Sequence, residues 1–291
     1  MKKAFLQLHL AIFLAGFTGV LGRLITLNEA LLVWYRMMFA AVTLFIIYFF
    51  SKKKDQLSLK AISNLFGIGG IIALHWVFFY GSIKYANVSV SLVCFSAIGF
   101  FSAILDPLIS KRKFVAIELL LGLLVMLGIS LMFHFDPQFR TGIIFGMISS
   151  LLAAIFPILN KKMMQIHDPG TITFFEMTGG FSILTLILPF YLHFVPATTM
   201  LPSLADLGWL LILSLLCTVL AFNLSVRSLS KISPFTVNLS FNLEPVYGIA
   251  LAFLLYKEYQ EVGMSFYIGI AIIFLTVVLQ TLRVYLQSKS K

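Results

Sequence analysis

Residues 4–50 of the chain read AFLQLHLAIFLAGFTGVLGRLITLNEALLVWYRMMFAAVTLFIIYFF, and they contain two long apolar runs, 4–24 and 30–50. A helix that crosses the hydrocarbon core of a bilayer needs about 20 predominantly apolar residues. Lys2 and Lys3 before an apolar run also resemble the start of a signal peptide, but this run continues for the length of a span. We therefore predict two membrane helices joined by a short loop.

The composition extends this prediction to the whole chain of 291 residues. Apolar residues make up 60% of the chain, charged residues make up 11%, and the mean hydropathy is +1.02. A soluble domain is about 45–50% apolar and about 25% charged, so this chain has too few charges to cover a water-exposed surface. Cys94 and Cys217 both lie in apolar runs, and two cysteines make no disulfide framework. We interpret both as small core residues.

The same length criterion finds ten apolar runs along the chain. The predicted spans are 4–24, 30–50, 65–83, 88–110, 116–134, 141–160, 171–194, 205–226, 234–256 and 264–286. The fold class predicted from them is an all-α integral membrane protein with ten transmembrane helices.

The positive charges alternate with these spans. If the N-terminus is cytoplasmic, 16 of the 21 Lys and Arg residues fall on the cytoplasmic side, four fall outside, and Arg36 lies inside the second span. Cytoplasmic loops of membrane proteins carry an excess of Lys and Arg. The bias predicts that both termini are cytoplasmic, and it explains the net charge of +10 without a nucleic-acid partner.

The two halves of the chain resemble each other, which predicts a repeat of five helices in residues 1–137 and a second one in 138–291. Trp34-Tyr35-Arg36 in the first half matches Phe174-Phe175-Glu176 in the second. Because five is an odd number, the second repeat must enter the membrane from the opposite side. Inverted repeats of this kind are common in secondary transporters, whose sites lie near the bilayer midplane.

Several functional classes have no support in the sequence. It has no GxxxxGK[ST] motif for phosphate binding and no close cluster of His, Cys and acidic residues with metal-ligand spacing. We predict no enzyme activity, no cofactor and no metal site.

Glu244 is the ionisable residue deepest inside a span. Charged groups at this depth are costly and mark functional sites or buried pairs. We predict that Glu244 binds substrate or a coupling ion, while packing as a neutral or paired acid is the alternative. Pro245 follows directly and frees the carbonyl of Phe241 from its helical bond, which predicts a hinge. We predict a second hinge at Pro107, where the neighbouring Asp106 is expected to pair with Lys111, Arg112 or Lys113.

Further polar and aromatic residues are candidates for the substrate site. Arg36 and Glu176 occupy matching places, and they could form an ion pair or contact the two ends of a zwitterion. At 100° per residue, Asn238 and Asn242 share one face of the ninth span and Glu244 lies on another, so either face could line a cavity. His75, Trp76 and Tyr80 could line a pocket, although a structural histidine and core aromatics are the alternative.

The order of these features resembles the EamA-type permeases of the drug/metabolite transporter superfamily. The resemblance rests on two five-helix repeats, on GVLGRLITLNEALLVWYRMMFAA at 19–41, and on NLEPVYGIALAFLLYKE at 242–258. It implies a bundle with a central cavity that exports small metabolites such as amino acids or drugs from the cytoplasm across a bacterial inner membrane. It also implies roles for Arg36, Glu244 and Pro245.

Rival functions stay open at this point. They are transport of lipids or nucleotide sugars, or a polytopic membrane enzyme or receptor. The expected partners are the lipid bilayer and a small-molecule substrate. Glycines in the spans 116–134 and 264–286 could support a homodimer.

Overall fold

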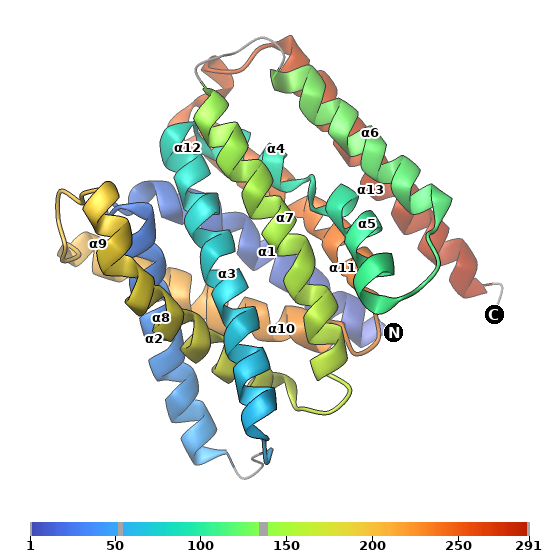
Figure 1. Ribbon diagram of the computed structural model, residues 1–291. Coiled ribbons are helices and arrows are strands. Elements are labelled where there is room, and N and C mark those ends of the chain that lie inside the picture. The colour runs from blue at the N-terminus through green and yellow to red at the C-terminus, as the bar shows by residue number, and fades with distance from the viewer. Residues whose placement is uncertain (1, 52–54, 134–138, 290–291) are drawn as a thin grey trace.

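The computed structural model describes residues 2–51, 55–133 and 139–289, and every regular element among them is a helix (Figure 1). The helices are α1 (Lys2–Leu24), α2 (Glu29–Phe50), α3 (Leu59–Tyr85), α4 (Val88–Phe95), α5 (Ile98–Ser110), α6 (Ala116–Phe133), α7 (Arg140–Met163), α8 (Pro169–Phe194), α9 (Leu204–Ser214), the π-helix η2 (Leu215–Leu220), α10 (Ala221–Ser228), α11 (Pro234–Ser240), the 3₁₀ turn η3 (Phe241–Leu243), α12 (Glu244–Tyr256), the 3₁₀ turn η4 (Glu258–Gln260) and α13 (Met264–Lys289).

Eight helical segments of the described chain are long and apolar enough to cross a membrane. They are 2–24, 29–50, 59–85, 88–110, 140–163, 169–194, 204–228 and 234–256. The remaining two predicted spans correspond to α6 and α13, whose apolar stretches are the shorter Ala116–Leu131 and Met264–Gln280. The chain is therefore a multi-pass membrane protein, and the number ten stays a prediction. The predicted boundary between the two repeats, 137/138, touches residues 134–138, which are outside the described part.

Side-chain caps fix where the helices begin. Asn28 accepts hydrogen bonds from the backbone N–H groups of Ala30 and Leu31 at the start of α2. Asp168 accepts one from Gly170 at the start of α8. These caps satisfy N–H groups that have no partner inside the helix. As a result, Arg36 and Glu176 both lie seven residues beyond the first residue of their helices, Glu29 and Pro169.

Close helix contacts rely on small residues. The helix α3 packs against α7 and α8, and α1 packs against α10 and α12. A Cβ atom added at Gly69 of α3 would overlap the backbone oxygen of Glu176, so α3 and α8 approach with their backbones in contact. Small residues allow this approach in membrane bundles, where lipid gives no hydrophobic drive for association.

The helices α6 and α13 pair along one edge of the bundle (Figure 1). A Cβ atom at Gly128 of α6 would lie 2.9 Å from the backbone oxygen of Gly269 of α13, so these glycines serve contacts inside the chain. The glycine argument for a homodimer therefore loses its support, and the dimer stays an untested prediction.

Two segments are broken in the same way. After the breaks at Ser96–Ala97 and at η3, the second parts, α5 and α12, are each 13 residues long. Each ends at a lysine with left-handed backbone, Lys111 with φ 52° and Lys257 with φ 57°. Matching these ends places Ile98 opposite Glu244.

The expected hinge at Pro107 does not coincide with the break of its segment. Pro107 lies inside α5 near its last turn, whereas the helix is interrupted at Ser96–Ala97. There, Ser96 N–H donates to Val93 and Ala97 N–H donates to Cys94, so the backbone follows a tighter turn. By contrast, Pro245 is the second residue of α12 and directly follows the 3₁₀ turn η3.

Candidate functional site

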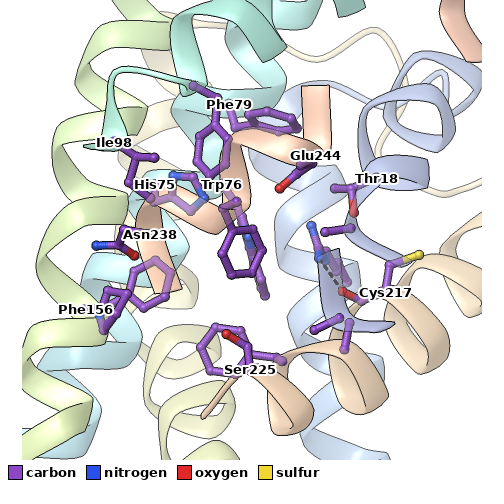
Figure 2. Close-up of a pocket in the computed structure, with 18 residues that line it drawn as sticks. Thr18, His75, Trp76, Phe79, Ile98, Phe156, Cys217, Ser225, Asn238 and Glu244 are labelled. Atoms are coloured by element: carbon purple, nitrogen blue, oxygen red, sulfur yellow. Dashed lines mark hydrogen bonds between the residues drawn. The ribbon is translucent and has the colours of Figure 1, made fainter. Parts of the chain in front are cut away.

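A cavity lies in the middle of the bundle, and residues of α1, α2, α3, α4, α5, α7, η2, α10, α11, η3 and α12 line it (Figure 2). The space inside it that the centre of a water molecule can reach is about 80 Å³. Its polar lining residues are Thr18, Arg36, His75, Cys217, Ser225, Asn238 and Glu244, and its aromatic lining residues are Trp76, Phe79, Phe95, Phe156, Phe222 and Phe241. The cavity therefore combines an apolar wall with a few convergent polar groups, as ligand sites do.

Arg36 is the buried cation of this cavity and is only 2% exposed. Its Nε donates to the Thr218 hydroxyl at 2.7 Å, its Nη1 donates to the Tyr80 hydroxyl at 2.7 Å, and its Nη2 donates to the Cys217 carbonyl at 3.3 Å. The guanidinium carbon lies 3.7 Å from the centre of the Trp76 ring, which is cation–π geometry. All of these partners are neutral, and among the described residues no acid forms an ion pair with Arg36 within 4 Å.

The Cys217 carbonyl that accepts from Arg36 belongs to a short π-helical turn that interrupts the α-helical segment 204–228. Residues 215–220 form the π-helix η2, in which the Thr218 hydroxyl donates to the carbonyl of Leu213 at 2.9 Å. Single π-turns inside α-helices are common at functional sites. Sequence reasoning did not find Thr218 or this turn, and no local signal separates LLCTVL from an ordinary apolar helix.

Glu244 is the only acidic residue on the cavity wall within the described chain, and it is 4% exposed. It begins α12, directly after η3, and Pro245 beside it has no N–H to donate. Figure 2 shows its carboxyl group pointing into the same space as Trp76 and Thr18. In the part of the chain that the structure describes, neither Glu244 nor Arg36 forms an ion pair within 4 Å.

Asn238 also reaches the cavity, although it lies on a different face of the predicted helix from Glu244. Its Nδ2 donates to the Ser102 hydroxyl at 3.2 Å and to the Ala154 carbonyl at 3.4 Å, while its buried Oδ1 has no partner. The turn η3 changes the helical register between the two residues, which brings both predicted faces to one cavity. The side chain of Asn242, the other predicted amide, lies outside the described residues.

The three candidates on α3 have different roles. Trp76 and His75 line the cavity. The Nδ1 of His75 lies 2.9 Å from the backbone oxygen of Ser149 and 2.8 Å from its hydroxyl, so this histidine has structural partners. Tyr80 is fully buried behind the cavity wall and contacts the site through Arg36.

Glu176 does not belong to this cavity. It is fully buried on α8, and no ion pair joins it to Arg36, because Arg36 turns toward α3 and η2 instead. The ion pair that the sequence allowed as one of two possibilities for Arg36 and Glu176 does not form in this structure. Matching places in two repeats gave the two residues equivalent positions but not proximity.

Two polar networks close the ends of the bundle. At one end, Arg23 pairs with the fully buried Glu258, whose carboxylate accepts hydrogen bonds from the backbone N–H groups of Val88 at 3.2 Å and Ser89 at 2.9 Å. Glu258 thus binds the N-terminus of α4, where an anion is favoured. The guanidinium of Arg23 also lies 4.4 Å from the centre of the Tyr256 ring.

At the other end, Arg112 joins α5 to α6. It lies 3.1 Å from Asp106 and 2.7 Å from Glu118. Glu118 also lies 3.7 Å from Arg283 on α13. The predicted pairing of Asp106 with the basic cluster after its helix is confirmed. Among the residues that the structure describes, no group of three or more His, Cys, Asp or Glu could hold a metal ion.

Comparisons with known proteins bear on the whole chain. The sequence model of the EamA-like transporter family matches residues 2–134 and 140–282. An "uncharacterized transporter" of Haemophilus influenzae is 28% identical over 149 residues, 48% of either chain. An "uncharacterized transporter" of Archaeoglobus fulgidus is 36% identical over 91 residues, 31% of this chain and 32% of that protein. The matches thus span about half or less of the length of these relatives.

A crystal structure with 12% sequence identity superimposes with a TM-score of 0.69 and covers 97% of both chains. At this identity the likeness concerns the fold alone.

Proposed function

This chain belongs to the EamA-like transporter family, and we propose that it exports small amphipathic metabolites, such as amino acids or drug-like amines, by alternating access. The observation that carries this proposal is a cavity holding one buried cation and one buried acid that form no ion pair. A zwitterion would place its carboxylate at Arg36 and its ammonium at Glu244. Its apolar part would lie against Trp76 and Phe222.

Arg36 suits the carboxylate end because no acid of the described chain forms an ion pair with it. Its neutral partners Thr218, Tyr80 and Cys217 fix the guanidinium plane. An Arg fork binds carboxylates bidentately. In a dry cavity such a contact is stronger than in water, because the effective dielectric is lower.

Glu244 suits exchange between the substrate amine and a proton. An ionised Glu244 attracts an ammonium group, and a protonated Glu244 does not. An inward proton gradient drives export if the proton displaces the substrate from Glu244 on the outer side and leaves Glu244 on the cytoplasmic side. In this scheme the proton and the substrate never occupy the carboxyl group together.

The motion we propose is rocking of two inverted five-helix repeats, 1–137 and 138–291, within ten spans. The matching breaks before α5 and α12 support this proposal, because Ile98 and Glu244 then face the cavity from equivalent positions. With both termini in the cytoplasm, as the Lys and Arg bias predicts, the Arg23–Glu258 network lies at the external end. It would open when the cavity faces outward.

The test is flux into liposomes that contain the purified protein, measured for a panel of amino acids and drug-like cations with and without a pH gradient. Gradient-driven flux of an amine-bearing solute that Glu244→Gln uncouples from the gradient is the expected result. Flux that is equal with and without the gradient in the unmodified protein would refute proton exchange at Glu244. Flux of lipids or nucleotide sugars alone would refute the proposed substrate class.

A further inference from the structure

Glu176 and Asn160 contain four of the nine buried side-chain nitrogen and oxygen atoms that lack a hydrogen-bond partner in the described chain. Both residues are fully buried, Glu176 on α8 and Asn160 on α7. Neither lines the central cavity. Buried polar atoms without partners are costly, so two such side chains in one place need an explanation.

Among the described residues, no charged side chain forms an ion pair with Glu176. Asn160 is the one side chain of the described chain placed to bond to its carboxyl group, although no hydrogen bond of normal geometry joins them in this structure. The α3 backbone at Gly69 lies against the α8 backbone at Glu176, and Met37 of α2 lies close by at Gly180. This part of α8 therefore packs against apolar side chains and glycine.

The titratable groups on α2, α3, α7, α8 and α10 have other partners or lie near the helix ends. Five of these groups have hydrogen-bond partners elsewhere: Arg36 with Tyr80 and Thr218, His75 with Ser149, Lys161 with the Leu229 carbonyl, Lys162 with the Ile109 carbonyl, and Glu29 with Tyr191. The others lie near helix ends, and they are Lys60, Lys84, Arg140, His193 and Arg227. None of them forms an ion pair with Glu176.

The four partnerless atoms match each other if Glu176 carries a proton. A neutral carboxylic acid has one O–H donor and one C=O acceptor, and a carboxamide has N–H donors and one C=O acceptor. The acid O–H can donate to Asn160 Oδ1 while Asn160 Nδ2 donates to the acid C=O, so two hydrogen bonds use all four atoms. An ionised Glu176 has no donor, and it would leave Asn160 Oδ1 without a partner and a negative charge buried without a counter-ion.

We propose that Glu176 and Asn160 form a proton-binding pair separate from the substrate cavity. The pair closes into an acid–amide ring that joins α7 to α8 when Glu176 is protonated, and it opens when the proton leaves. The position equivalent to Glu176 in the first half holds Arg36, whose charge does not titrate. The two halves of the chain therefore differ at this position, and α8 responds to protonation where α2 does not. This proposal does not depend on the substrate or on proton exchange at Glu244.

Infrared difference spectra between the unmodified protein and each variant, both purified as the full chain in detergent, test the pair directly. We expect a C=O band of a hydrogen-bonded carboxylic acid in the unmodified protein. Glu176→Gln should remove the intensity of one carboxylic acid, and the matched variant Glu244→Gln should leave that band in place. A Glu176→Gln spectrum that retains the full intensity would overturn the proposal.

A second variant keeps the proposal testable if Glu176→Gln fails to fold. Asn160→Ala leaves the acid in place but removes the one amide of the described chain that is placed to bond to it, so the band should shift to the higher frequency of a carboxyl group without hydrogen bonds. An unshifted band in Asn160→Ala would show that the two side chains do not bond.

Thermal unfolding between neutral and alkaline pH gives a third readout. The unmodified protein should lose thermal stability as the pH rises, because the pair loses its O–H donor. Glu176→Gln should flatten that part of the profile, since an amide cannot lose this proton and still bonds to Asn160. Profiles with the same slope in both proteins would contradict the proposal.

Discussion

The buried guanidinium of Arg36 offers the most quantitative test of the site. In Arg36→Lys the charge remains, but an ammonium group at the end of a flexible stem cannot reproduce a planar fork. The structure gives Arg36 three hydrogen bonds, to the Thr218 hydroxyl, the Tyr80 hydroxyl and the Cys217 carbonyl. We expect lysine to keep one of them and to lose the other two.

The size of the effect follows from these bonds. Side-chain hydrogen bonds inside membrane proteins average about 0.6 kcal/mol and reach about 1.7 kcal/mol, so two lost bonds cost about 1–3 kcal/mol. For a chain of this size, 1 kcal/mol shifts the midpoint of thermal unfolding by about 2–4 °C. We therefore expect Arg36→Lys to unfold about 2–12 °C below the unmodified protein in the same detergent.

A control and a double variant separate the fork from the charge. Arg140→Lys makes the same exchange at an exposed position on α7 and should leave the midpoint unchanged. Thr218→Ala removes the partner of Nε, so its effect and that of Arg36→Lys should be less than additive. An unchanged midpoint in Arg36→Lys, or full additivity in the double variant, would refute the proposed role of these bonds.

Three further predictions follow from contacts elsewhere in the bundle. Gly69→Ala should destabilise the protein by about 1–3 kcal/mol or prevent its folding, because the new methyl group overlaps the α8 backbone. In the control Gly67→Ala the new methyl group has no atom within 4 Å, so this variant should express and elute from a sizing column as the unmodified protein does. Glu258→Gln should lower the free energy of unfolding, measured by chemical denaturation, by about 1–3 kcal/mol, because it removes a buried ion pair whose acid also bonds to the N-terminus of α4. If the control Glu261→Gln, at a nearby exposed position, lowers it as much, the buried pair is not responsible. Glu244→Gln should make substrate binding, measured by calorimetry on the purified protein, independent of pH over the range where the unmodified protein responds, and a retained response would assign the titration to another group.

The positions of the helices were predictable because a spanning helix must be apolar over its whole length. The predicted span 30–50 and the helix Glu29–Phe50 differ by one residue at the start. Arg36 and Glu244 were also predictable, because a charge inside an apolar run is rare enough to mark a site.

The breaks inside the helices were not predictable from the sequence. The turn η3 and the π-helix η2 arise where the backbone adapts to neighbouring helices, and apolar sequence does not encode that choice. As a result, the sequence placed Asn238 and Glu244 on different faces, whereas the structure brings both to the cavity. Asn160 was missed because it precedes Lys161 and Lys162 and looked like part of a polar helix end.

The lining of the cavity also limits how the membrane voltage can act on transport. Glu244 is the only acid on the wall within the described chain, so under the proposed exchange a single proton enters through the cavity for each solute that leaves. Export of a zwitterion then moves one net charge inward, and a potential of 100 mV contributes about 2.3 kcal/mol to it. Export of a monovalent cation by the same exchange is electrically silent, so current across a planar bilayer would reveal the charge of the cargo.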